Sequence, residues 1–112
     1  MRPLPVLAIP ILAAALSAPA IGGALEAKRV TVGDNFFRQS SISQVRNGRV
    51  TWVWRAKRKH DVFFYRAPAG ATPKKCPLQR RGRCTRTFRA VGTYRYICTR
   101  HGSMVGRVTV RR

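Results

Sequence analysis

The chain has few histidines, cysteines and acidic residues, and these shortages limit the chemistry it can carry. Its 112 residues include two histidines, three cysteines and three acids. No cysteine precedes Cys76, which excludes a lipid-anchored cysteine near the N-terminus. Helical periodicity is nearly absent after residue 27, and no internal repeat is visible. The length suits a single domain. The lack of helical periodicity indicates that this domain is not helical.

Charge is also missing from the N-terminal segment, which has none over residues 3–25. A basic start, an apolar centre (LPVLAIPILAAAL) and a small-residue exit (SAPAIGGA) are typical of a secretory signal peptide. Cleavage after Ala20 and after Ala24 both suit the small-residue rule. An uncleaved membrane anchor is the alternative, because the run is long enough to span a bilayer. We expect residues 1–24 to direct export and residues 25–112 to form an extracytoplasmic domain, whether periplasmic, cell-surface or secreted.

Positive charge is abundant, since 23 Lys and Arg against three acids give a net charge of +20. Such a balance first suggests a nucleic-acid partner. The basic residues are instead spread along the chain and mostly alternate with apolar residues, as the solvated positions of strands do. An exported chain also meets little nucleic acid, so we do not expect that partner. A general arginine bias of the surface stays an alternative to a functional role for the charge.

Alternating apolar residues predict short β-strands through the rest of the chain. Asn47-Gly48 predicts a hairpin turn between two of them. Residues 67–84 are rich in Pro and Gly and predict a connecting loop. About seven short strands with frequent turns indicate an all-β sandwich or barrel with an aromatic core. The predicted strands are 29–32, 40–45, 49–55, 60–66, 85–89, 93–97 and 106–110, and the predicted core aromatics are Trp52, Trp54, Phe88, Tyr94 and Tyr96.

Three cysteines in an oxidising compartment favour one disulfide and leave one thiol over. Of the three pairings, Cys76 with Cys84 is the local one, and it closes the loop CPLQRRGRC. Cys98 is then unpaired and available for another use.

Cys98, His101 and Met104 follow one another at intervals of three between two predicted strands. Thiolate and thioether are soft ligands and imidazole is borderline, a set that suits copper. Two His and one Cys in a plane, with a long axial Met, define a type 1 copper site. The second histidine that this site needs would be His60, which begins another predicted strand.

These motifs resemble the small cupredoxins, the group of plastocyanin, amicyanin and pseudoazurin. VTVGDNFF resembles their first-strand opening, GRVTWVW their third strand, and HDVFF the strand that begins with the first ligand. TFRAVGTYRYICTRHGSMVGRVTV resembles their closing motif, in the short-loop spacing closest to amicyanin. The resemblance implies a Greek-key β-sandwich of about seven to eight strands that holds one type 1 copper ion.

The same resemblance assigns a role to each site residue. It implies that His60 and His101 bind copper through ring nitrogens, Cys98 as thiolate and Met104 weakly from the axial side. The position after the first ligand is often Asn or Ser, hydrogen-bonded to backbone near the cysteine. Here Asp61 occupies it, and we expect Asp61 to contact the ligand loop.

The sequence therefore predicts an exported, monomeric electron carrier that is not an enzyme. The resemblance makes His101 the exposed ligand where the redox partner docks, and the basic residues nearby favour an acidic partner, such as a cytochrome or a copper enzyme. Membrane contact through a retained anchor or an anionic surface is compatible with this function. Five basic residues near the histidines are expected to steer the partner; this basic rim consists of Arg55, Lys57, Arg58, Lys59 and Arg100.

Several alternatives use the same residues. Zinc also accepts thiolate and imidazole, although methionine is a poor zinc ligand. A nucleophilic Cys98–His101 pair oriented by Asp61 would make an enzyme, but no oxyanion-hole signal accompanies it. Two histidines supply no ligands for the further copper centres that oxygen or nitrite reduction needs. Copper storage or delivery, and a basic surface-binding structural domain with a vestigial metal site, are the remaining alternatives.

Overall fold

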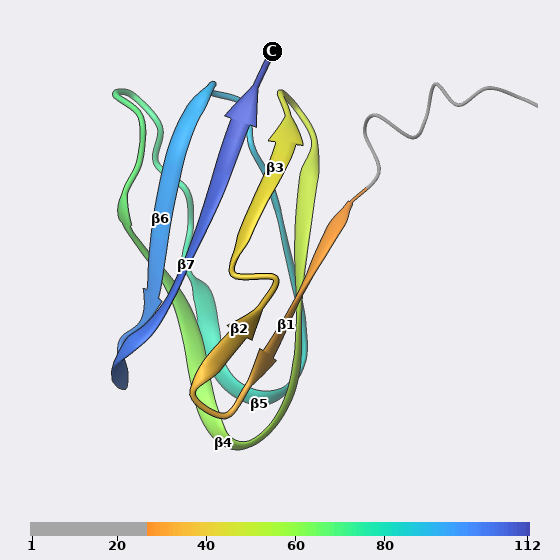
Figure 1. Ribbon diagram of the computed structural model, residues 1–112, viewed down its shortest axis with the longest axis vertical. Helices are drawn as coiled ribbons and strands as arrows, with labels where there is room; N and C mark the ends of the chain where they lie inside the picture. Colours follow the sequence, from red (N-terminus) through yellow and green to blue (C-terminus); the bar gives the residue numbers. More distant parts are fainter. Residues whose placement is uncertain (1–26) are drawn as a thin grey trace, which may run out of the picture.

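The computed structural model describes residues 27–112, which form β-strands and no helix (Figure 1). Within this part of the chain, therefore, no helix could cross a membrane. The expected signal segment, residues 1–24, lies outside the described residues. The all-β prediction is confirmed. The strands are β1 (Lys28–Gly33), β2 (Phe36–Arg38), β3 (Ser41–Val45), β4 (Arg49–Arg66), β5 (Cys76–Thr87), β6 (Gly92–Cys98) and β7 (His101–Arg111).

The strands form a strongly curled sheet that folds into two layers. They pair in the order β2-β1-β4-β6-β7-β3, and β5 pairs with β4. The first part of β4 pairs with β1 and the second part with β6, so this strand passes from one layer to the other. In Figure 1, β6, β7 and β3 lie in front of β4 and β5. The result is the sandwich that the resemblance implied.

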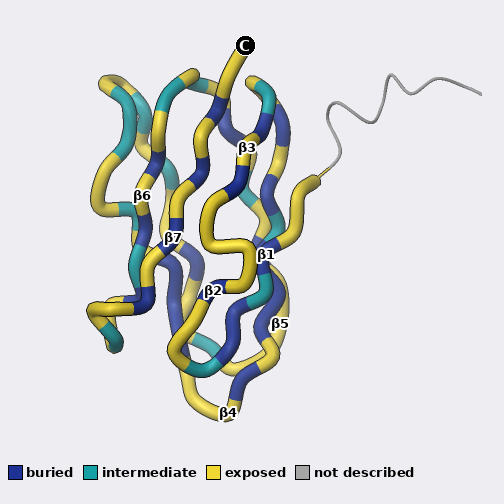
Figure 2. The backbone as a smooth tube through the Cα atoms, in the orientation of Figure 1, coloured by how far each residue is buried: buried dark blue, intermediate teal, exposed yellow. Residues whose placement is uncertain are grey.

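Side chains from both layers fill the space between them with aromatic rings. Burial alternates along β3 and β7, and dark and light segments follow one another there in Figure 2. The five aromatic residues expected in the core are each 2% exposed or less. Four of these rings meet edge to face in pairs, with centroids 5.4 Å apart for Trp52 and Tyr96 and 4.8 Å for Phe88 and Tyr94. This geometry suits the charge distribution of aromatic rings and fixes the two layers against each other.

Two predictions about β4 and β5 were wrong. The strands expected at 49–55 and 60–66 are one strand, β4, with register shifts between Arg55 and Val62. The second half of the expected loop is strand as well, since β5 begins at Cys76. The reason is that β5 pairs with β4 on both sides of the irregular stretch, which satisfies the backbone there in spite of Pro and Gly.

The predicted hairpin at Asn47-Gly48 was also wrong, although a turn exists there. The Gly48 N–H donates to the Val45 carbonyl at 2.9 Å, and Asn47 has a positive φ of 70°. The strands on either side do not pair with each other, because β3 pairs with β7 and β4 pairs with β1. The turn instead exchanges hydrogen bonds with Phe88 and connects the two layers.

The predicted disulfide is confirmed. Cys76 and Cys84 are bonded, with their Cα atoms 6.0 Å apart, and Cys98 is the free, buried cysteine. Cys76 pairs in register with Val62 and Cys84 with Trp52, on opposite sides of the irregular part of β4. The disulfide therefore links the two ends of the segment of β5 that lies along the irregular part of β4.

Candidate metal centre

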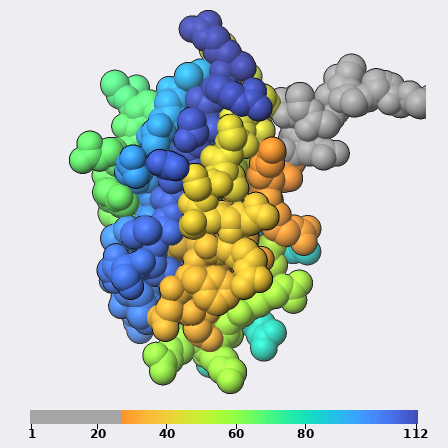
Figure 3. All heavy atoms as spheres, in the orientation of Figure 1, coloured from red at the N-terminus to blue at the C-terminus, as the bar shows by residue number. Residues whose placement is uncertain are grey.

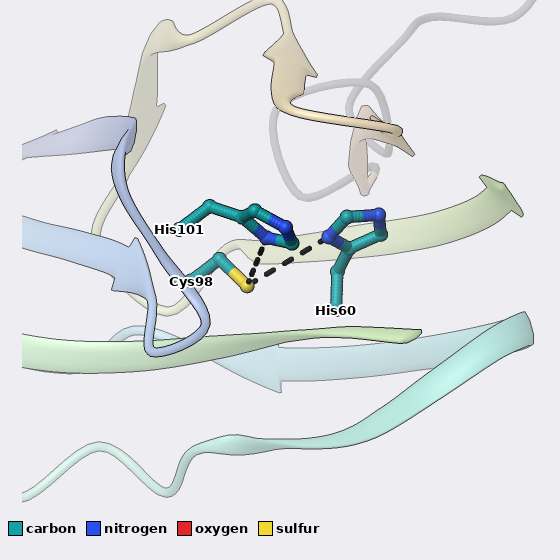
Figure 4. Close-up of side chains that lie close together, drawn as sticks. All are labelled: His60, Cys98 and His101. Carbon is teal, nitrogen blue, oxygen red and sulfur yellow. Dashed lines mark hydrogen bonds between the residues drawn. The ribbon is translucent and has the colours of Figure 1, made fainter. Parts of the chain in front are cut away.

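Three strands bring two histidines and the free cysteine together at one end of the sandwich. His60 lies within the irregular stretch of β4, Cys98 ends β6 and His101 begins β7. Cys98 and His101 pair in register across the short turn between their strands. His60 reaches the same place from the other side, as Figure 4 shows.

The spacing of these side chains fits a single metal ion. Cys98 Sγ lies 3.8 Å from His60 Nδ1 and 3.6 Å from His101 Nδ1, and the three candidate ligand atoms lie within 4.8 Å of one another. An ion at ordinary bond lengths to one sulfur and one nitrogen, in a trigonal plane, would hold the sulfur and the nitrogen about 3.7 Å apart. The two sulfur–nitrogen distances therefore already match those of a bound ion.

Burial differs among these residues in a way that matters for access. His60 and Cys98 are fully buried, whereas His101 is partly exposed. Met104, three residues after His101 on β7, is 1% exposed and belongs to the same buried cluster as Cys98. Its neighbour Val105 pairs with Ile97, which precedes Cys98. The methionine thus lies in the interior at the same end of the sandwich.

Asp61 contacts the ligand loop at the place where the sequence suggested it would. The Thr99 N–H donates to Asp61 Oδ1 at 2.7 Å, and the Thr99 hydroxyl donates to Oδ2 at 2.7 Å. Both bonds join β4 to the residue that follows Cys98. The carboxylate therefore restrains the turn between Cys98 and His101.

Asp34 is a site residue that the sequence analysis missed. It follows β1, and its Oδ1 lies 2.9 Å from His60 Nε2. Its oxygens also accept the backbone N–H groups of Lys57 and Arg58 at 2.9 and 3.0 Å. The bond with His60, aided by these two, holds the pKa of Asp34 well below its usual range. The scarcity of acids was the one signal that could have drawn attention to it.

The side chains of the basic rim lie at this end of the molecule and form no ion pair with an acid among residues 27–112. All five of its residues are exposed, and the single ion pair among residues 27–112 joins His60 and Asp34. Register places Arg55 opposite Arg81, so β5 adds arginines to the rim. Figure 3 shows side chains of these segments, in yellow-green and teal, projecting at the lower edge. Like charges on neighbouring strands repel each other and leave a positive surface.

A β-sandwich that gathers two imidazoles, a thiol and a thioether at one end is the architecture of a small copper protein. The chain belongs to the plastocyanin/azurin family of copper binding proteins, whose family model matches residues 27–111. His60, Cys98, His101 and Met104 are positioned to bind one copper ion.

Known proteins similar to this chain include amicyanin. Amicyanin of Paracoccus denitrificans is 37% identical over 62 residues, which make up 54% of this chain and 47% of that protein. The match thus spans about half the length of that relative. A reduced amicyanin with tryptophan replaced by tyrosine superposes with a TM-score of 0.68 at 28% identity, covering 83% of this chain and 86% of the other. A Cu(I) form of another variant at pH 4 gives 0.67 at 29% identity, covering 76% and 82%.

Proposed function

We propose that the protein is an exported electron carrier in which one copper ion alternates between Cu(I) and Cu(II). The observation that carries this function is the set of two imidazole nitrogens and one sulfur within 4.8 Å, in a chain of a copper-binding family. In this proposal His60, Cys98 and His101 would hold the ion, and Met104, buried at the same end, would be the weaker fourth ligand. The bound copper supplies the one-electron chemistry.

The chain's own contribution is to hold the ligands still. The Cys98–His101 register pair and the bonds from Thr99 to Asp61 restrain the ligand turn. Cys98 would hold the ion as a thiolate, and its proton would pass to solvent on binding. A site already close to its bound geometry needs little rearrangement between oxidation states, and this favours rapid electron transfer.

His101 is the route by which electrons would enter and leave. It is partly exposed, whereas His60 and Cys98 are enclosed by protein. Exposed Gly102 and Val105, the latter 49% exposed, lie beside it on β7. A partner that docks over His101 would also meet the basic rim, which favours an acidic partner and fast encounter with a monomer. Export through residues 1–24 and an extracytoplasmic location of the domain are part of this proposal.

The protein is proposed as a carrier and not as an enzyme. Its two histidines are both used at this site, which leaves no imidazole for a second copper centre. Storage or delivery of copper would need ready release of the ion. Burial of His60 and Cys98 supports slow exchange instead, and the rate of copper loss to a chelator would distinguish these functions.

The visible absorption spectrum tests the proposed function. The exported protein, purified with its disulfide formed and given Cu(II), should show an intense thiolate-to-copper band that ascorbate bleaches. Cys98→Ser should abolish the band. A wild-type protein that stays colourless would overturn the copper-carrier proposal, and preferential binding of zinc would then indicate a structural metal site.

A further inference from the structure

We propose that Asp34 is a positioning residue of the metal site. Its carboxylate holds His60 in the tautomer that leaves Nδ1 free to bind copper. The negative charge of the same carboxylate favours Cu(II) over Cu(I). The electronic part of this inference rests on the proposed function. The tautomer part concerns the metal-free protein and can be tested without copper.

The first step is the direction of the hydrogen bond. An ionised carboxylate only accepts hydrogen bonds, so the contact of 2.9 Å between Asp34 Oδ1 and His60 Nε2 places the ring proton on Nε2. The other nitrogen of a neutral imidazole is then an acceptor. This Nδ1 is the atom 3.8 Å from Cys98 Sγ, and it points toward the sulfur in Figure 4.

The second step is that the carboxylate is itself fixed in place. The N–H groups of Lys57 and Arg58 donate to it from the irregular stretch of β4, which also contains His60. Register pairing with β5 is interrupted between Arg55 and His60, so these amides lie outside the regular ladder. One side chain, that of Asp34, therefore accepts hydrogen bonds from the backbone of the irregular stretch and from the ring of His60. The position of His60 is thereby coupled to the position of that stretch.

The third step is the contrast between the two histidines. His101 has no hydrogen bond from Nε2 to another group within residues 27–112, and its Nδ1 contacts Cys98. Its tautomer is therefore not set by a carboxylate. A negative charge behind His60 makes this ring the more basic ligand and stabilises the higher charge of Cu(II). Removal of that charge should raise the midpoint potential.

The test uses nitrogen chemical shifts of the metal-free protein at neutral pH and the midpoint potential of the copper form. In the wild type, His60 should carry its proton on Nε2 alone. In Asp34→Asn, which keeps the shape of the side chain but not its charge, the ring should populate both tautomers. Affinity for Cu(II) should fall about tenfold or more. If affinity for Cu(I) is unchanged, a tenfold loss raises the potential by about 59 mV.

Three controls distinguish a local effect of Asp34 on His60 from a general effect on charge or folding. His101 in the same spectra should show no change in Asp34→Asn. The shift in potential should persist at high salt, since screening would remove a long-range charge effect. Circular dichroism of the variant checks that the fold is kept. Wild-type His60 with its proton on Nδ1 would overturn the tautomer part, and this needs no variant.

The remaining outcomes are also decisive. An Asp34→Asn variant that is folded, with unchanged Cu(II) affinity and potential, would refute the electronic part. A wild-type protein without a copper-thiolate band would refute the proposed function, while the tautomer of His60 in the metal-free protein would still be decided by its nitrogen shifts.

Discussion

Replacing Cys76 and Cys84 by serine removes the disulfide that links two residues of β5, and we expect a large loss of stability. The two residues are separated by 8 positions. For a loop of that size, the lost restriction of the unfolded chain corresponds to about 2.5 kcal/mol. In a domain this small, that loss should lower the melting temperature by about 10–20 °C.

The assay is urea unfolding of the metal-free protein, because bound copper would add a stabilisation that depends on its concentration. Reduction of the wild type by a thiol should give the same free energy of unfolding as the double serine variant. The copper band should keep its position, since the proposed ligands lie on β4, β6 and β7 and not on β5. A loss below about 1 kcal/mol would refute the reasoning, because the link would then restrict the unfolded chain much less than its loop implies.

Three further outcomes are expected. Burial raises the pKa of Tyr96 from 10.0 to about 12, so the unfolded chain ionises first. The stability that this residue contributes is complete below pH 10 and should fall by about 2–3 kcal/mol as pH rises through 12. In alkaline unfolding curves Tyr96→Phe should lose less stability than the wild type, although buried Tyr94, whose pKa is also raised, still contributes a loss; an identical loss in both proteins would contradict the prediction. Met104→Leu should keep the blue colour and raise the midpoint potential, and voltammetry that shows no change would exclude axial ligation by the thioether. Replacing the five residues of the basic rim by glutamine should slow reduction of the copper by hexacyanoferrate(II) about tenfold at low salt and flatten the salt dependence of the rate. A matched control replaces five arginines around the opposite end of the molecule: Arg46, Arg49, Arg89, Arg111 and Arg112. Equal slowing in the control would show that total charge matters and not the basic rim.

Local pattern in the sequence was sufficient for the strand content, the core aromatics and the candidate ligands. Alternation reflects the two-residue period of a strand, and it therefore identified Trp52, Trp54, Tyr94 and Tyr96 as inward-facing residues. Cys98 and His101 could be joined because only a short turn separates their strands. His60 could be added because the chain has no other histidine to offer.

The missed features depend on contacts between distant parts of the chain. The continuity of β4 and the strand character of β5 follow from their mutual pairing, which neither segment specifies alone. Asn47-Gly48 makes a turn in either topology, so its residues do not reveal whether the flanking strands pair. Asp34 meets His60 across 26 residues, and its neighbours in the sequence contain no sign of that contact.

The passage of β4 through both layers has a consequence for how the molecule opens. Because one strand of 18 residues contributes to each layer, neither layer can separate while the other stays intact. Amide hydrogens in the middle of β4 should exchange with solvent only when the whole domain unfolds. Two fragments made by cutting the chain within β4 should not fold separately. Mixed together, they should reassemble into a native-like complex, as expected for a protein with a single cooperative unit.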